Sequence, residues 1–358
     1  MKIATILGAR PQFIKASMVS NKISDYLNMS EVIIHTGQHF DENMSKIFFE
    51  EMGIPEPDYN LGINSISHGA MTGRMLEELE KLIVSEKPDW VLVYGDTNST
   101  LAGSLAAVKL GVPIAHVESG LRSFNMKMPE EINRILTDRL SALLFCPTET
   151  SVNNLNNEGI IDDGRKIVLN GDVMYDAFLH YSNIVQEKRP LLKKLRIENS
   201  SFILCTLHRP HNTGYQDRLE SIVVALNSLN KTQKVVLPVH PRTRKAIEKN
   251  KIMTTFDLIP PVSYLDMIEL LRNCSLVITD SGGLQKEAYF SGKFCVTLRD
   301  ETEWVELVNE GANFISGAHT NTIITLVEDL MNKESDFSER LYGNGEASAI
   351  IVEELARA

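Results

Sequence analysis

Short apolar runs alternate with longer amphipathic stretches along nearly the whole chain. The runs are rich in Val, Ile and Leu and have the length of buried strands, whereas the stretches between them have helical periodicity. This alternation is typical of βαβ units and parallel sheets. The predicted strands of the first half are 2–7, 32–36, 90–94, 114–117, 143–145 and 167–169, and those of the second half are 202–206, 234–238, 256–259, 276–279, 294–298 and 313–315.

Each half of the chain holds enough strands for one doubly wound sheet. The sequence therefore predicts an α/β protein with two Rossmann-like domains that face each other across a cleft. The stretch 173–200 contains a predicted connecting helix and the charged segment QEKRPLLKK, so we place the boundary near its start. The final helix, from about Ala347, is expected to pack back on the first domain. The expected domains are residues 1–172 with 345–358, and residues 173–344.

Composition limits the class of partner. The 358 residues include 36 Lys and Arg against 47 Asp and Glu, so the formal net charge is -11. This charge disfavours nucleic acids and acidic membranes, and an anionic ligand must meet a local basic site. The apolar run at the start, MKIATIL, is too short for a membrane span, so we expect a cytoplasmic protein. The four cysteines sit in or beside strand-like runs, which favours core packing over a disulfide frame or zinc site.

Polar and charged residues follow almost every predicted strand. The segments are GARPQ, TGQHFD, YGDTNST and HVESG in the first half, and LHRPHN, PVHPRT, TDSGG and LRDETE in the second. The carboxyl ends of parallel strands are where open α/β sheets bind ligands. Ordinary caps and turns explain any one of these segments but not easily all eight, so we expect a polar site.

The segment TDSGGLQKEA has two interpretations of about equal weight. Ser281, Gly282 and Gly283 form either a plain turn with a helix cap or an anion site at a helix N-terminus, where glycines allow a phosphate to come close. If the segment holds a nucleotide diphosphate, Glu287 is one helical turn further on and can reach the sugar hydroxyls. The alternative for Glu287 is an exposed helix residue.

Cations are expected near the first and the seventh of the predicted strands. In GARPQFIK, Arg10 is predicted in a loop and Lys15 one turn into the next helix, where an anion would relieve two cations close to a helix start. Both can also be ordinary surface residues. His208, in LHRPHN, belongs to a cluster at a strand end that favours phosphate contact or acid catalysis over a structural role.

Three carboxylates are candidates for proton transfer. Asp96 follows a strand directly, although Thr97 to Ser99 also suit capping of a helix that begins near Thr100. Glu118 ends a strand with His116 and Arg122 nearby. Glu130 stands at a predicted helix start, where the helix dipole alone explains it. Together, however, the three suit proton transfer on two faces of one substrate.

Several well-known sites are missing. There is no GxGxxG dinucleotide fingerprint after the first strand, no GxxxxGK[ST] loop and no convincing metal-ligand spacing. Nicotinamide-dependent enzymes and P-loop NTPases are therefore disfavoured.

The ordered motifs GARPQFIK, HTGQHFD, YGDTNSTLAG, HVESGLRS, MPEEINR, LHR and TDSGGLQKEA resemble those of the non-hydrolysing UDP-N-acetylglucosamine 2-epimerase family over nearly the whole chain. The family has the two-domain glycosyltransferase-B-like fold, is usually dimeric, and binds UDP mainly to the C-terminal domain. Within the family, the segments GARPQFIKAS, TGQHFDENMS and RSFNMKMPEEINR are most similar to those of members that act on UDP-2,3-diacetamido-2,3-dideoxy-D-glucuronate. Those members supply the manno sugar for surface polysaccharides such as O-antigen.

The resemblance implies a mechanism and a set of residues. UDP leaves while the hydrogen on carbon 2 is removed, and it adds back to the resulting glycal with protonation from the opposite face. The implied acid/base carboxylates are Asp96, Glu118 and Glu130. The residues implied to assist the departing diphosphate are Lys15 and His208. The implied UDP contacts are Arg10, Ser281, Gly282, Gly283 and Glu287. No redox cofactor or metal is implied.

The chain also departs from the family pattern. Members that use a second substrate molecule as an activator read HRREN and carry Gln three residues beyond QH, whereas this chain has HRPHN and Asp41 there. We therefore expect no requirement for substrate activation. A uronate substrate needs a cation for its carboxylate, and Arg74, Arg122 and Arg134 are the candidates. The competing functions are the same reaction on UDP-N-acetylglucosamine, a hydrolysing epimerase, a glycosyltransferase of this fold and a sugar-nucleotide sensor.

Overall fold

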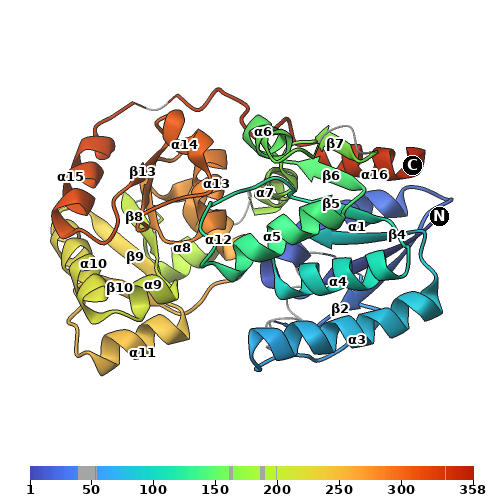
Figure 1. Ribbon diagram of the computed structural model, residues 1–358. Coiled ribbons are helices and arrows are strands. Elements are labelled where there is room, and N and C mark those ends of the chain that lie inside the picture. Colours follow the sequence, from blue (N-terminus) through green and yellow to red (C-terminus); the bar gives the residue numbers. More distant parts are fainter. Residues whose placement is uncertain (39–52, 54, 161–163, 186–189, 199, 335) are drawn as a thin grey trace. The chain divides into compact units, whose positions relative to one another are not determined.

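The computed structural model describes the chain except for residues 39–52, 54, 161–163, 186–189, 199 and 335, and the side chain of Arg10 also lies outside the described part. The chain forms two compact units (Figure 1). The first comprises Met1–Ala177 and Arg340–Ala358, and the second comprises Phe178–Glu339. As a division by function, the expected boundaries at 172/173 and 344/345 stay predictions.

The first unit is built on a parallel sheet with the strand order β3-β2-β1-β4-β5-β6-β7. Its strands are β1 Lys2–Leu7, β2 Ser30–His35, β3 Tyr59–Asn60, β4 Trp90–Tyr94, β5 Ile114–Val117, β6 Leu143–Cys146 and β7 Lys166–Leu169. Its helices are α1 Arg10–Ser24, α3 His68–Glu86, α4 Asn98–Lys109, α5 Pro129–Leu140, α6 Glu149–Asn157, the start of α7 Val173–Val185, and α16 Ala347–Arg357. The six strands predicted here are confirmed, with shifts of at most two residues at their ends. The two-residue β3 was not predicted because it is too short to show a period.

The second unit is built on another parallel sheet, with the order β10-β9-β8-β11-β12-β13. Its strands are β8 Phe202–Thr206, β9 Lys234–Pro238, β10 Asp257–Ile259, β11 Leu276–Thr279, β12 Cys295–Thr297 and β13 Asn313–Ile315. Its helices are the end of α7, α8 Pro190–Leu195, α9 Pro210–Thr213, α10 Gln216–Leu229, α11 Pro241–Lys249, α12 Tyr264–Asn273, α13 Gly282–Phe290, α14 Val305–Asn309 and α15 Thr320–Met331. All six strands predicted for this half are confirmed, so each half is a doubly wound α/β sheet.

Each sheet has a point at which its strand order reverses direction. In the first unit β1 and β4 are neighbours there, and in the second unit β8 and β11 are. Connections after such neighbouring strands run to opposite faces of the sheet, which leaves a ligand-sized space at their carboxyl ends. The segments that follow these strands are GARPQ, YGDTN, LHRPHN and TDSGG, so the fold brings the expected site segments to the two reversal points.

The central strands, such as β4, β5, β8 and β11, are buried on both faces, as their near-continuous apolar sequences require. The four cysteines are free and buried, so the expectation that they pack in the core is confirmed, and burial raises the pKa of Cys274 and of Cys295 to about 12. The last helix, α16, packs on α1 as predicted. Asp176 fixes its start, because the carboxylate accepts hydrogen bonds from the backbone N–H groups of Ala347 at 3.1 Å and Ser348 at 2.7 Å.

Two helix starts differ from the prediction. Arg10, predicted in a loop, is the first residue of α1, since Pro11 favours a first helical turn and the Gln12 carboxamide oxygen accepts from the N–H groups of Gly8 and Ala9. Helix α4 begins at Asn98 rather than near Thr100, because Thr97 is the capping residue and its hydroxyl accepts from the Thr100 N–H. Across the described ranges, no helix is long and apolar enough to cross a membrane.

Candidate active site

An ion pair joins two of the expected site residues in the first unit. The ammonium of Lys15, on α1, contacts the carboxylate of Glu118, which follows β5. Only 8% and 13% of their side-chain surfaces are exposed. The backbone of Glu118 is left-handed, with φ of 77°, a conformation that costs a non-glycine residue about 1 kcal/mol or more. A buried carboxylate held in strained backbone at a strand end is a strong indication of function.

Gly95, at the end of β4, lies against this ion pair. Its φ of 62° favours glycine. A Cβ atom placed on it would stand 3.2 Å from Oε2 of Glu118 and 3.8 Å from Nζ of Lys15. The loop that leads into Asp96 therefore packs directly against the ion pair, and the structure brings Lys15, Asp96 and Glu118 into one cluster.

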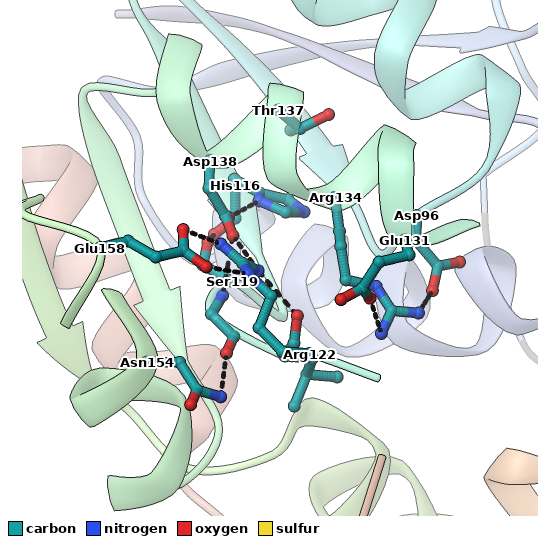
Figure 2. Close-up of polar contacts among 12 residues, drawn as sticks. Asp96, His116, Ser119, Arg122, Glu131, Arg134, Thr137, Asp138, Asn154 and Glu158 are labelled. Atoms are coloured by element: carbon teal, nitrogen blue, oxygen red, sulfur yellow. Dashed lines mark hydrogen bonds and ion pairs between the residues drawn. The ribbon is translucent and has the colours of Figure 1, made fainter. Parts of the chain in front are cut away.

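Asp96 is held by Arg134, from α5. The Nη2 atom of Arg134 lies 2.5 Å from Oδ2 of Asp96, and Nη1 lies 3.2 Å from a carboxylate oxygen of Glu131 (Figure 2). The protein atoms packed around Asp96 raise its pKa above the ordinary value, and the charges of Glu118 and Glu130 add to this effect. Arg134 and Lys15 oppose it. Asp96 therefore holds a proton more readily than an exposed aspartate.

The two glutamates at the start of α5 have different roles. Glu130 is partly exposed, and its charge acts on Asp96, so it belongs to the same electrostatic cluster. Glu131 is fully buried and accepts hydrogen bonds from the backbone N–H groups of Ser123 and Phe124 at 2.8 to 3.1 Å. Glu131 thus fixes the segment before α5 and steadies Arg134. Its role was not predicted, because the loop it binds is identified only by the fold.

Behind these residues is a buried polar cluster that the sequence did not indicate. His116 and Arg122 were expected beside Glu118, but the structure places them on Asp138, from α5 (Figure 2). Burial by itself raises the pKa of Asp138, but hydrogen bonds and attraction from His116 and Arg122 outweigh it and hold the pKa below its ordinary value. Glu158 accepts two further hydrogen bonds from Arg122, at 2.6 and 2.8 Å.

In the second unit, Asp280 organises the segment that carries His208. Its fully buried carboxylate accepts from the backbone N–H groups of His208 at 3.1 Å and Arg209 at 2.9 Å. Nδ1 of His208 lies 3.3 Å from Oδ1 of Asp280. Desolvation lowers the pKa of His208, as do Arg209 and Arg242, and Asp280 opposes them. The Asp of TDSGG therefore shapes the histidine loop, while the residues after it begin α13.

The start of α13 fits both interpretations of the SGG segment. Ser281 is the capping residue, with its hydroxyl accepting from the Leu284 N–H at 3.4 Å. A Cβ on Gly282 would lie 2.5 Å from a carboxylate oxygen of Glu303, whereas a Cβ on Gly283 would meet nothing within 4 Å. The exposed Gly283 leaves the helix start open to an anion. Glu287 is 6% exposed, so the alternative of a solvent-exposed helix residue is wrong.

The three arginines considered for a uronate carboxylate differ in their partners. Arg122 is bound to Asp138 and Glu158, and Arg134 is bound to Asp96 and Glu131. Arg74, on α3, is exposed. Its exposure leaves Arg74 as the remaining candidate of the three.

Two other expectations concern residues in or near the segment 39–52. Gln38 is described, and its carboxamide oxygen accepts from the N–H and the hydroxyl of Ser99, at 3.1 and 2.8 Å. Asp41 lies outside the described residues, as does the side chain of Arg10. Among the residues that the structure describes, no group of three or more His, Cys, Asp or Glu side chains is arranged to hold a metal ion.

Comparisons with known proteins give a consistent relationship. A profile of the UDP-N-acetylglucosamine 2-epimerase family matches residues 21–356. The chain is 56% identical over 358 residues to UDP-2,3-diacetamido-2,3-dideoxy-D-glucuronate 2-epimerase of Pseudomonas aeruginosa, with 100% of both chains covered. It is 50% identical over 362 residues to a UDP-N-acetylglucosamine 2-epimerase homolog of Methanococcus maripaludis, covering 99% of each. The crystal structure of Methanocaldococcus jannaschii UDP-GlcNAc 2-epimerase with UDP-GlcNAc and UDP matches with a TM-score of 0.92 at 41% identity, over 100% of both chains.

Proposed function

Because the chain belongs to the UDP-N-acetylglucosamine 2-epimerase family, we propose that it inverts carbon 2 of UDP-2,3-diacetamido-2,3-dideoxy-D-glucuronate to give the manno epimer. The family makes the protein a UDP-sugar 2-epimerase, an isomerase with the two-domain glycosyltransferase-B-like fold. The observation that carries the choice of substrate is the 56% identity, over the full length of both chains, to the Pseudomonas enzyme of that name.

The reaction we propose has two balanced steps. A carboxylate takes the proton from carbon 2, the bond between carbon 1 and the anomeric oxygen breaks, and UDP leaves with that oxygen to give a 1,2-unsaturated sugar. UDP then re-forms the bond to carbon 1 while carbon 2 receives a proton on its other face. No net oxidation occurs. The site must hold UDP throughout and must present acid/base groups to both faces of the sugar.

In our proposal Asp96, Glu118 and Glu130 supply those acid/base groups. The raised pKa of Asp96, to which the charges of Glu118 and Glu130 contribute, supports this assignment, since a carboxyl group that keeps its proton more readily suits the role of an acid. Lys15, paired with Glu118, is proposed to stabilise the diphosphate as it departs from carbon 1. Its contact with Glu118 supports this role, since a positive charge beside an acid/base group would lie close to the reacting carbon.

The proposed UDP contacts come mainly from the second unit. The open helix start at Ser281, Gly282 and Gly283 suits a phosphate, because the N–H groups of Gly282 and Gly283 belong to the first helical turn and the glycines add no side chain. Glu287 follows on the same helix and is proposed to bind the ribose hydroxyls. His208, held by Asp280, is proposed to hydrogen-bond or protonate the diphosphate. Arg10, from the first unit, is proposed as a further phosphate contact.

The proposal also covers the assembly, the location and the biological role of the enzyme. We propose that the enzyme acts as a homodimer in the cytoplasm and supplies a sugar for a surface polysaccharide. A second candidate substrate is UDP-N-acetylglucosamine, which is favoured by the 41% identity to the archaeal UDP-GlcNAc 2-epimerase. A hydrolysing epimerase and a glycosyltransferase of this fold use the same nucleotide site but give different products.

Proton NMR in deuterated water tests the proposal, with the two UDP-sugars in separate tubes. We expect only the uronate to become the manno epimer, with deuterium at carbon 2 and no free sugar. Turnover of UDP-N-acetylglucosamine alone would overturn the choice of substrate. Release of free sugar would identify a hydrolysing enzyme, and an absence of deuterium at carbon 2 would rule out the elimination route.

A further inference from the structure

The carboxylate of Asp138 lies beneath both loops that carry the proposed acid/base residues. It is completely buried on α5, beside His116 of β5 and Arg122 of the loop after β5 (Figure 2). Its Oδ1 atom is 2.7 Å from Nδ1 of His116, and its Oδ2 atom accepts from the Gly120 N–H at 3.1 Å and from Nη1 of Arg122 at 2.7 Å. Neither the mechanism nor the proposed ligand contacts use this group.

Through His116, Asp138 is connected to the loop that carries Asp96. Nε2 of His116 lies 2.7 Å from the carbonyl oxygen of Gly95, the residue that precedes Asp96. A carbonyl oxygen can only accept a hydrogen bond, so Nε2 of His116 donates to Gly95 while Nδ1 contacts Asp138. The two contacts of His116, with Asp138 and with the Gly95 carbonyl, therefore fix the backbone that precedes Asp96.

Asp138 also contacts the loop that carries Glu118. Gly120, two residues after Glu118, donates its N–H to Asp138 and accepts from the Asn154 amide at 2.9 Å through its carbonyl. Its φ of 78° and the φ of 77° at Glu118 make this a sharp turn in which both residues are left-handed. Such a turn persists only where the surroundings hold it, and Asp138 is one of the groups that do so.

We propose that Asp138, acting through His116 and Gly120, is a positioning residue that sets the separation of Asp96 from the ion pair of Glu118 with Lys15. This inference rests on the proposed assignment of Asp96 and Glu118 as acid/base groups. A single carboxylate holds both loops, so displacing it moves both proton-transfer groups relative to one sugar carbon. Proton transfer is sensitive to such shifts, because the groups must stand within hydrogen-bonding reach of the carbon-bound hydrogen.

The chemistry explains why an aspartate is needed rather than an asparagine. His116, Gly120 and Arg122 all donate, and together they approach both oxygens. An amide in place of the carboxylate presents its NH2 group either to Gly120 and Arg122, where donor meets donor, or to His116, whose Nδ1 must then lose its proton in order to accept. The substitution also removes one of the two carboxylates bound to the buried Arg122 and leaves it Glu158.

The test is Asp138→Asn in the full chain, with Asp176→Asn as the matched control. Asp176 is also buried and accepts backbone and hydroxyl hydrogen bonds, but its donors are Ala347 and Ser348 at the start of α16. We expect Asp138→Asn to lower kcat by about 100-fold while KM changes by less than about threefold, and the control to lower kcat by less than about threefold. Equal effects of the two variants on kcat would overturn the proposal.

A second variant and a spectrum keep the test informative if Asp138→Asn does not fold. His116→Gln retains a donor for the Gly95 carbonyl but loses the contact to Asp138, and we expect a smaller loss of kcat with KM again nearly unchanged. Nitrogen-15 NMR of the wild-type ring should show a proton on Nε2 of His116, the nitrogen that faces the Gly95 carbonyl. A ring without a proton on Nε2, or His116→Gln with unchanged kcat, contradicts the proposal.

Two further variants distinguish an error in this inference from an error in the proposed function. Asp96→Asn and Glu118→Gln are measured beside Asp138→Asn with whichever UDP-sugar the wild type turns over. If those two variants keep full activity, the assignment of the acid/base residues is wrong. If they lose activity while Asp138→Asn and His116→Gln do not, only the positioning role is wrong.

Discussion

The ammonium of Lys15 and the carboxylate of Glu118 form an ion pair that is nearly closed to solvent, although the two residues are more than a hundred positions apart in the chain. Lys15 comes from α1, Glu118 directly follows β5, and Gly95 packs against the pair. The pair links the expected diphosphate cation to an expected acid/base group. Its disruption should therefore affect both stability and chemistry, and the two effects can be measured apart.

Glu118→Gln should abolish most of the activity. We expect kcat to fall by about 100-fold to 10,000-fold, because an amide cannot exchange a proton with carbon 2. The variant should also be less stable by about 3 kcal/mol, since a buried ammonium loses its partner carboxylate. The assay is turnover in deuterated water together with denaturant unfolding. The double variant Lys15→Met with Glu118→Gln should regain stability but not activity, and a Glu118→Gln enzyme within about threefold of wild type in kcat would exclude the catalytic role.

Arg134→Gln should move the acid limb of the pH profile of kcat to higher pH. Arg134 lowers the pKa of Asp96, which burial raises, so removing the arginine raises that pKa further. Asp96 must then reach a higher pH before it can accept a proton. The control is Arg139→Gln, an exposed arginine on the same helix. An acid limb that stays in place, or moves to lower pH, would show that Asp96 does not govern it.

Arg134→Gln should also change how the stability of the protein depends on pH. Because the folded protein holds the proton of Asp96 more tightly than the unfolded chain does, this group stabilises the fold most at low pH. The contribution is lost as pH rises from the ordinary value of 3.8 through the raised pKa. Arg134→Gln should therefore lose more stability relative to wild type at neutral pH than at about pH 4, as measured by unfolding at both pH values.

Gly283→Ala should weaken nucleotide binding without cost to the fold. A Cβ at this position meets no protein atom within 4 Å, and it would project from the exposed helix start where we propose that phosphate binds. Alanine also favours the helix, so we expect unfolding to require up to about 1 kcal/mol more. The UDP dissociation constant, measured by calorimetry, should rise about tenfold or more, a cost of about 1.4 kcal/mol.

Gly282→Ala is the matched comparison at the neighbouring position. Its Cβ would stand 2.5 Å from a carboxylate oxygen of Glu303, so the variant should lose stability as well as affinity. If Gly283→Ala binds UDP as tightly as wild type does, the start of α13 is a turn with a cap and does not hold the phosphate.

The dependence of rate on substrate concentration should be hyperbolic. The chain has HRPHN where substrate-activated members of the family read HRREN, and the carboxamide oxygen of Gln38 is already bound to Ser99 at the start of α4. Initial rates over a wide range of UDP-sugar concentration test this. A sigmoidal curve that becomes hyperbolic or is lost in Gln38→Ala would reveal an activator site and contradict the expectation.

The strands and the ends of the strands were determined by the sequence. Buried parallel strands need continuous apolar runs, and that local requirement is visible without any knowledge of contacts. For the same reason the segments with Asp96, Glu118, His208 and Ser281 were expected at the carboxyl edges of the sheets. The two-residue β3 was missed, because a strand that short has no period of its own.

Pairings between distant residues were decided by the tertiary structure alone. Alternation along a strand would put His116 and Glu118 on one face, yet the His116 ring turns to Asp138 of α5. The strand ends at Val117, and the left-handed backbone of Glu118 gives its side chain another direction. Glu130 and Glu131 are adjacent in sequence, but the helix directs one toward Asp96 and buries the other under the loop before it. Composition and period specify which residues reach an edge of a sheet. Only the packing of α5 against the strand ends decides which carboxylate accepts backbone hydrogen bonds, as Glu131 does, and which remains near Asp96, as Glu130 does.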